Sequence, residues 1–224
     1  MNKSRASLAV FARRVAAKGH SVVIPDLWGT GDSEGDFRDA SLRRWRDNLT
    51  DVCAWFRSQG GEFEHIVNLR FGSLLTVDWL AHSGPQSFRN LICIQPILQG
   101  TQAISQWLRL ASSGRLLAEK SQPLSPKDEL QTNGIVNCGG YELSRQLATD
   151  IEPLRLVADS ALRLHLFEVK GRGDSLSPAL QKVQETTDNV GLGGVISAPP
   201  FWTSTEIVHV DLASSVLPCM GSAS

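Results

Sequence analysis

Short apolar runs divide the chain at regular intervals and predict its strands. Runs at 21–25, 65–69, 90–95 and 162–169 are continuously apolar or nearly so, and a shorter run stands at 194–197. Continuous runs of this length are typical of strands that are buried on both faces of a sheet. We therefore predict five strands, most of them central in a parallel sheet.

Segments with apolar residues at helical spacing lie between these runs. They predict helices at 8–16, 42–56, 73–82 and 178–187. Strands that alternate with helices pair in parallel, with helices on both faces of the sheet. The pattern thus predicts an α/β fold with a mostly parallel central sheet.

The alternation stops after Pro96, where a mostly helical pattern begins and continues to about Ala158. We interpret this stretch, with its polar, proline-containing piece at 121–129, as a cap or lid inserted into the sheet domain. The predicted organisation is an N-terminal part of the core at 1–98, the cap at 99–158, a C-terminal part of the core at 159–217 and a tail at 218–224.

Composition and charge narrow the range of partners. The 224 residues are 42% hydrophobic and 20% charged, with 22 basic against 23 acidic residues and a net charge of −1. This balance gives no long-range attraction to nucleic acid or anionic lipid, so a small-molecule ligand is favoured. No apolar stretch is long enough to span a bilayer and no secretory signal is visible, so we expect a cytoplasmic protein.

The four cysteines suggest neither a metal site nor a redox centre, because no two of them stand at ligand or CxxC spacing. The sequence predicts no metal and no cofactor. We therefore expect any functional site to consist of side chains and backbone groups without a metal.

Three segments together resemble the α/β-hydrolase superfamily. These are SVVIPDLWGTGDSEG at 21–35, HIVNLRFGSLL at 65–75 and LHLFEVKGRGDSLSP at 164–178. In that superfamily they correspond to a strand with its glycine-rich loop, the nucleophile elbow, and the strand and loop that carry the catalytic acid. The resemblance implies a sheet with a nucleophile at the elbow and hydrolysis of an ester or acyl bond.

A closer resemblance is to the second type of hydrolase associated with the exosortase A system. NLRFGSLL, QPILQG, GYELS and PPFW followed by TEI carry it, in that order along the chain. The resemblance implies a role in exopolysaccharide production and exosortase sorting.

The elbow departs from the superfamily pattern G-x-S-x-G at its apex. Here the five positions, 68–72, read Asn-Leu-Arg-Phe-Gly, so that Arg70 stands where the serine belongs. A guanidinium stays protonated and cannot attack an acyl group. Two interpretations remain open. Arg70, with Phe71 beside it, binds an anionic ligand, or Arg70 forms a structural ion pair with Asp26 or Asp32.

The other members of a catalytic triad are equally incomplete. Ser73 is the nearest hydroxyl to the apex, but we expect it to cap the following helix. Asp174 follows the strand at the place where the superfamily has its acid. The stretch 197–202, where the base belongs, contains no histidine, so His209 is the nearest candidate.

The N-terminal part of the superfamily pattern is also incomplete. Only seven residues precede the first helix, which cannot form the three strands that the superfamily has there. From the resemblance we expect Met1 to be an internal start or the sequence to be an N-terminally truncated fragment. The loop that would supply an oxyanion-hole N–H is then missing.

Two functions follow. One is an acyl or ester hydrolase, as the resemblance implies. The alternative is a catalytically degenerate protein of the same fold that binds a small acidic ligand or a partner protein through Arg70 and the cap.

Overall fold

A four-stranded parallel sheet organises the chain. In a computed structural model, which describes residues 2–83, 87–117, 124–157, 161–203 and 209–221, the strand order is β1–β2–β5–β6. The strands are β1 (His65–Leu69), β2 (Asn90–Ile94), β5 (Arg163–Lys170) and β6 (Val190–Ser197), and every neighbouring pair is parallel. The predicted α/β class and four of the five predicted strands are confirmed.

Strand β2 shows why the apolar runs are continuous. Leu91 and Cys93 pack into one hydrophobic cluster, whereas Ile92 and Ile94 pack into the other. All four side chains are fully buried. Because successive side chains of a strand point to opposite faces, a strand covered on both faces must be apolar at every position.

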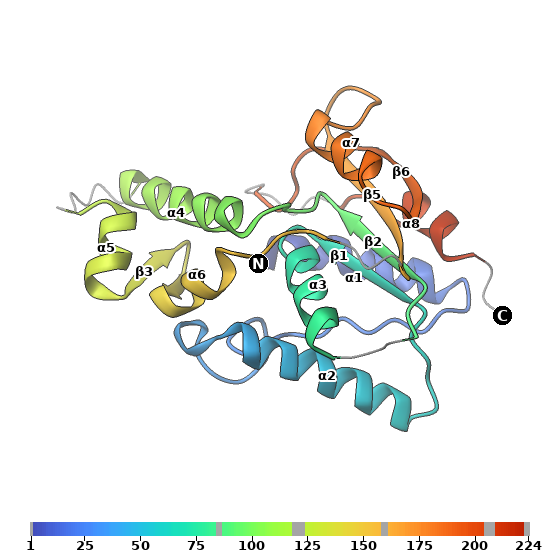
Figure 1. The fold of residues 1–224 in the computed structure, drawn as a ribbon, viewed down its shortest axis with the longest axis horizontal. Coiled ribbons are helices and arrows are strands. Elements are labelled where there is room, and N and C mark those ends of the chain that lie inside the picture. Colours follow the sequence, from blue (N-terminus) through green and yellow to red (C-terminus); the bar gives the residue numbers. More distant parts are fainter. Residues whose placement is uncertain (1, 84–86, 118–123, 158–160, 204–208, 222–224) are drawn as a thin grey trace.

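Helices cover both faces of the sheet (Figure 1). Helix α1 (Asn2–Ala16) and the C-terminal helix α8 (Ala213–Met220) pack on one face, where Phe11 and Val216 share a hydrophobic cluster. Helices α2 (Leu42–Ser58) and α3 (Gly72–Ser83) pack on the other face. A short 3-10 helix, η1 (Phe37–Asp39), precedes α2, and α7 (Pro178–Glu185) connects β5 to β6.

The segment at 21–25 does not form the predicted strand. It has no regular secondary structure and pairs with no strand of the sheet, and β1 lies at the edge. An extended segment becomes a strand only when a neighbour takes up its backbone hydrogen bonds. The apolar residues of 21–25 are used differently, since Val22 packs against the hydrophobic cluster beneath α1.

Residues 100–117 and 124–151 form a cap that projects from the sheet, at the left of Figure 1. It contains α4 (Gly100–Leu117), α5 (Pro126–Asn133) and α6 (Arg145–Ile151), and also a hairpin of β3 (Ile135–Cys138) and β4 (Tyr141–Ser144). Helices make up most of the described cap, as predicted, and the hairpin is an element that the sequence analysis did not expect. Gly139 and Gly140, both at positive φ (64° and 95°), form its two-residue turn, as paired glycines commonly do.

The ends of the predicted domains are partly outside the described residues. This applies to the boundary at 158–159 and to residues 222–224 of the predicted tail. Residues 218–220, which we expected in that tail, belong to α8, and Cys219 is buried there.

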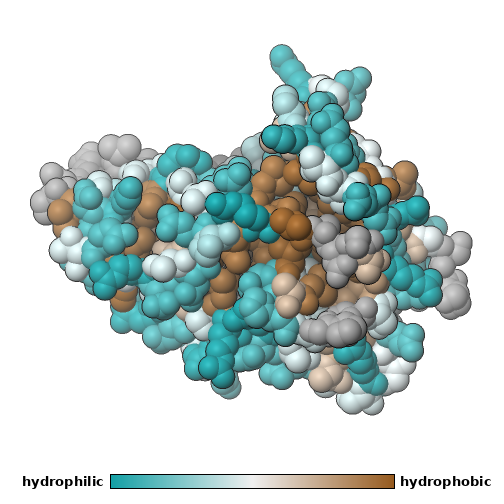
Figure 2. Space-filling view, viewed as in Figure 1, coloured by the Kyte–Doolittle hydropathy of each residue, from teal (hydrophilic) through white to brown (hydrophobic). Residues whose placement is uncertain are grey.

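On the face seen in Figure 1, hydrophobic residues gather near the middle of the molecule and hydrophilic residues cover much of the rest (Figure 2). Within the described part of the chain, no helix combines the length and the apolar character that crossing a membrane requires.

Candidate ligand-binding site at the strand–helix elbow

The chain turns sharply between β1 and α3, as predicted, and Arg70 is the residue at the apex. Its φ is 58°, in the left-handed region that a residue with a side chain rarely adopts. Three backbone hydrogen bonds hold this conformation. Arg70 N–H donates to Ile94 O (3.0 Å), and its carbonyl accepts from Ser73 N–H (3.2 Å) and Ile97 N–H (3.3 Å).

The strained apex gives a stability prediction. Arg70→Gly and Arg70→Ala remove the same guanidinium, but only glycine adopts this φ without a steric penalty. We expect Arg70→Gly to be more stable than Arg70→Ala by about 1 kcal/mol. Urea unfolding of the two variants measures this difference, and equal midpoints with equal slopes would show that the apex is not strained.

The guanidinium of Arg70 lies between the core and the cap. It stacks on the Trp202 ring, with 4.8 Å from its central carbon to the ring centroid. It also donates a hydrogen bond to the Gln106 side-chain oxygen on α4. Arg70 is half-buried, and burial lowers its pKa without a counter-charge to raise it. Among the described residues no carboxylate forms an ion pair with this guanidinium.

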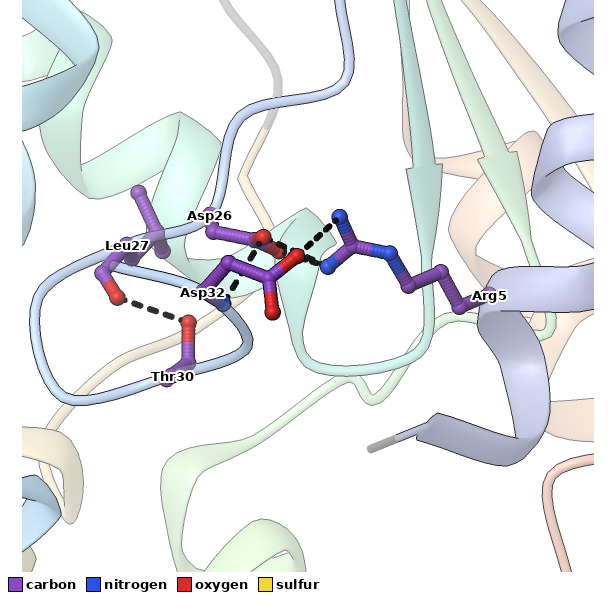
Figure 3. A network of polar contacts seen from close by, with 5 residues as sticks. All are labelled: Arg5, Asp26, Leu27, Thr30 and Asp32. Atoms are coloured by element: carbon purple, nitrogen blue, oxygen red, sulfur yellow. Dashed lines mark hydrogen bonds and ion pairs between the residues drawn. The ribbon is translucent and has the colours of Figure 1, made fainter.

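The structure decides against the structural ion pair that was one of the two interpretations. Asp26 and Asp32 both turn to Arg5 of α1 (Figure 3). The Arg5 guanidinium lies 2.5 Å from Asp26 and 3.4 Å from Asp32, and its hydrogen bond holds the pKa of Asp26 below the usual value. The carboxylates of the glycine-rich loop therefore compensate the charge of Arg5, and neither of them compensates the charge of Arg70.

The first turn of α3 adds a second positive feature beside Arg70. Within the described structure, neither Phe71 N–H nor Gly72 N–H has a hydrogen-bond acceptor. Free N–H groups at a helix start carry partial positive charge and bind anions. The Phe71 ring is held at this place by Trp45 and Trp107, with centroids 6.0 Å and 5.2 Å away.

Ser73 lies beneath the elbow, inside the protein. It is fully buried as the second residue of α3, and its hydroxyl has no hydrogen-bond acceptor or donor of ordinary geometry among the described residues. The Cys93 thiol, whose pKa burial raises to about 12, is a neighbour of the Ser73 hydroxyl. A substrate in solvent has no access to a hydroxyl with zero exposure.

Asp174 and His209 are both solvent-exposed. Asp174 lies in the loop after β5, and His209 lies ahead of α8 in a segment without helical structure. No hydrogen bond or ion pair in the described structure joins them to each other, to Ser73 or to Arg70. The residues that the sequence suggested for a triad are thus not assembled here. Among the described residues no group of three or more histidine, cysteine or acidic side chains is placed to hold a metal ion.

Sequence reasoning missed two partners of Arg70, namely Gln106 and Trp202. Neither stands in a motif, and they are 36 and 132 residues away along the chain. It also missed Gln95, the other described non-glycine residue with positive φ (46°), which lies at the end of β2 beside the elbow. The Gln95 side-chain oxygen accepts from Val169 N–H (2.7 Å), which ties the ends of β2 and β5 together.

Comparison with known proteins identifies the fold to which this elbow belongs. No protein-family model matches the sequence, and no curated protein sequence matches it either. Solved structures do match. A protein assigned as a hydrolase from Agrobacterium vitis S4 is 18% identical, with 88% of this chain and 78% of that chain aligned at a TM-score of 0.57. A thioesterase domain from the curacin biosynthetic pathway is 16% identical, with 96% and 85% aligned at a TM-score of 0.51.

At these identities the likeness concerns the fold and not the chemistry. The parallel sheet, the helices on both faces and the strand–turn–helix elbow agree with it. The chain therefore has the α/β-hydrolase fold.

Proposed function

We propose that the elbow binds a small anion, a carboxylate or a phosphate, without forming a covalent bond to it. One observation carries the proposal: the half-buried guanidinium of Arg70 has no carboxylate partner among the described residues. Taking a charge out of water without a counter-charge is costly, so such sites are commonly completed by a ligand.

The chemistry around Arg70 fits an anion. A guanidinium offers N–H donors in a planar fork that matches carboxylate and phosphate oxygens. The free N–H groups of Phe71 and Gly72 at the start of α3 are a second set of donors next to it. Trp202 and Phe71 supply apolar surface for the body of an organic acid. We therefore assign Arg70 and Phe71 as the ligand-binding residues.

The second candidate is the acyl or ester hydrolase that the sequence resemblance implies, with a role in exopolysaccharide and exosortase systems. In its favour stand the fold and the free Phe71 N–H, which occupies the position of an oxyanion donor. It also requires a nucleophile, and the nearest hydroxyl, Ser73, is enclosed in the core. We therefore place anion binding first.

Binding of benzoate and of inorganic phosphate to the whole chain, followed by calorimetry, tests the proposal. We expect Arg70→Ala to weaken binding of the preferred anion at least about tenfold, because hydrogen bonds to a charged group contribute about 1.5–3 kcal/mol. Arg44→Ala is the matched control, since Arg44 also stacks on a tryptophan (Trp28, 3.9 Å) but is exposed. Equal affinities of wild type and Arg70→Ala would refute the proposal.

A parallel assay separates the two candidates. The chain is incubated with p-nitrophenyl acetate and with a fluorophosphonate probe, beside a Ser73→Ala variant. We expect no labelled serine and the same ester turnover in both proteins. Labelling that Ser73→Ala abolishes would instead establish the hydrolase.

A further inference from the structure

The cap contacts the elbow at two consecutive residues of α4. Gln106 accepts a hydrogen bond from the Arg70 guanidinium, and the Trp107 ring packs edge-on against Phe71, with 5.2 Å between centroids. Both ligand-binding residues of the proposed site are therefore in contact with the same turn of the cap helix.

The connection between core and cap keeps this contact in register. The two linkers run side by side: Leu156 N–H donates to Leu98 O (2.9 Å), and Gly100 N–H donates to Leu154 O (2.8 Å). These paired linkers, residues 97–100 and 154–156, are called the ribbon below. The ribbon is also hydrogen-bonded to the elbow, because Ile97 N–H donates to Arg70 O. Because α4 starts at Gly100, within the ribbon, the position of Gln106 is fixed relative to Arg70.

Gln106 is a neutral group in a position that suits a negative one. Its amide oxygen satisfies one N–H of the guanidinium but brings no charge to compensate it. A carboxylate or phosphate oxygen makes a stronger hydrogen bond to the same donor, because both partners are then charged. The amide can be exchanged for an anion at small cost, since a glutamine side chain that is released regains its hydrogen bonds to water.

We propose that Gln106 is an internal competitor of the ligand: its side-chain oxygen occupies the guanidinium until an anion displaces it. The inference rests on the proposed anion site and adds the residue that sets its affinity. Gln106 also selects for ligand charge, because a neutral amide or ester offers Arg70 no advantage over the oxygen that is already bound.

Two substitutions of Gln106 test this in opposite directions, with benzoate and inorganic phosphate as probes. Gln106→Ala removes the competitor, and we expect tighter binding of the preferred anion, by about threefold to tenfold. Gln106→Glu places a carboxylate on Arg70, and we expect binding to fall below one tenth of the wild-type affinity. Ser105→Ala is the control, since Ser105 is exposed on the same helix and bonds only within it.

A measurement on the unsubstituted chain does not depend on the folding of the variants. The side-chain amide of Gln106, observed by nitrogen-15 NMR, is expected to shift on addition of benzoate or phosphate and to approach the position of a solvated glutamine. An unchanged Gln106 signal at anion saturation would overturn the competitor role.

The outcomes separate this inference from the anion site itself. If wild type and Gln106→Ala both fail to bind either anion, the proposed function fails, and the inference fails with it. If wild type binds through Arg70 but Gln106→Ala and Gln106→Glu bind with wild-type affinity, the site stands and only the competitor role is refuted.

Discussion

Gly100→Ala is expected to destabilise the protein by more than about 3 kcal/mol, the upper end of ordinary overpacking. An alanine Cβ at this position would lie 1.7 Å from Ile151 O and 2.9 Å from Glu152 O, both backbone atoms that cannot rotate away. The ribbon that joins core and cap would have to open. Chemical denaturation followed by circular dichroism measures the loss, and a change below about 1 kcal/mol would show that the cap is not held as described.

Gly114→Ala is the matched control, because it lies in the same helix, α4. A Cβ there meets no atom within 4 Å. Replacing glycine by alanine inside an exposed helical position ordinarily stabilises a helix by about 0.5–1 kcal/mol. The two substitutions should therefore have opposite signs, and stabilisation by both would show that helix propensity alone decides the effect at Gly100.

Acidification is expected to destabilise the fold through His165. This side chain is buried in β5. Its Nδ1 accepts a hydrogen bond from Leu192 N–H (2.9 Å), and its Nε2 therefore carries the proton and donates to Asn90 Oδ1 (3.0 Å). Burial, with smaller contributions from Arg163 and His65, lowers the pKa of His165 from 6.5 to about 4.

The direction of the pH effect follows from the lowered pKa. The unfolded chain binds the His165 proton near pH 6.5 and the folded chain near pH 4, so stability is full above 6.5 and falls between 6.5 and 4. The shift corresponds to a loss of about 3 kcal/mol when complete. Urea unfolding from pH 7.5 to 4 measures it, with His165→Gln expected to show a shallower decline. Parallel pH curves for the two proteins would contradict this role of His165.

Burial on both faces made the central strands predictable. The run at 91–94 is apolar at every position, as burial on both faces of the sheet requires. The same signal failed at 21–25, because an apolar run does not reveal whether a neighbouring strand is present to pair with it. The hairpin of the cap was visible in principle, since Gly139–Gly140 between two β-prone segments is a turn signal.

The candidate site was also predictable only in part. The elbow, and the positive φ at its apex, follow from the local order of strand, turn and helix, so the sequence placed Arg70 correctly at the turn. The partners of Arg70 depend on tertiary contacts across 36 and 132 residues, which no local pattern encodes. The ion pair that we had considered for Asp26 and Asp32 exists, but with Arg5, since α1 brings that residue over the loop.

The anion site at Arg70 is tested most directly on the guanidinium itself. The Nε–Hε resonance of Arg70, assigned by its loss in Arg70→Lys, is followed by nitrogen-15 NMR while benzoate or phosphate is added to the whole chain. We predict that this resonance shifts and saturates with the affinity found by calorimetry. If an anion binds and the Arg70 resonance stays in place throughout, the ligand lies elsewhere and the account is wrong.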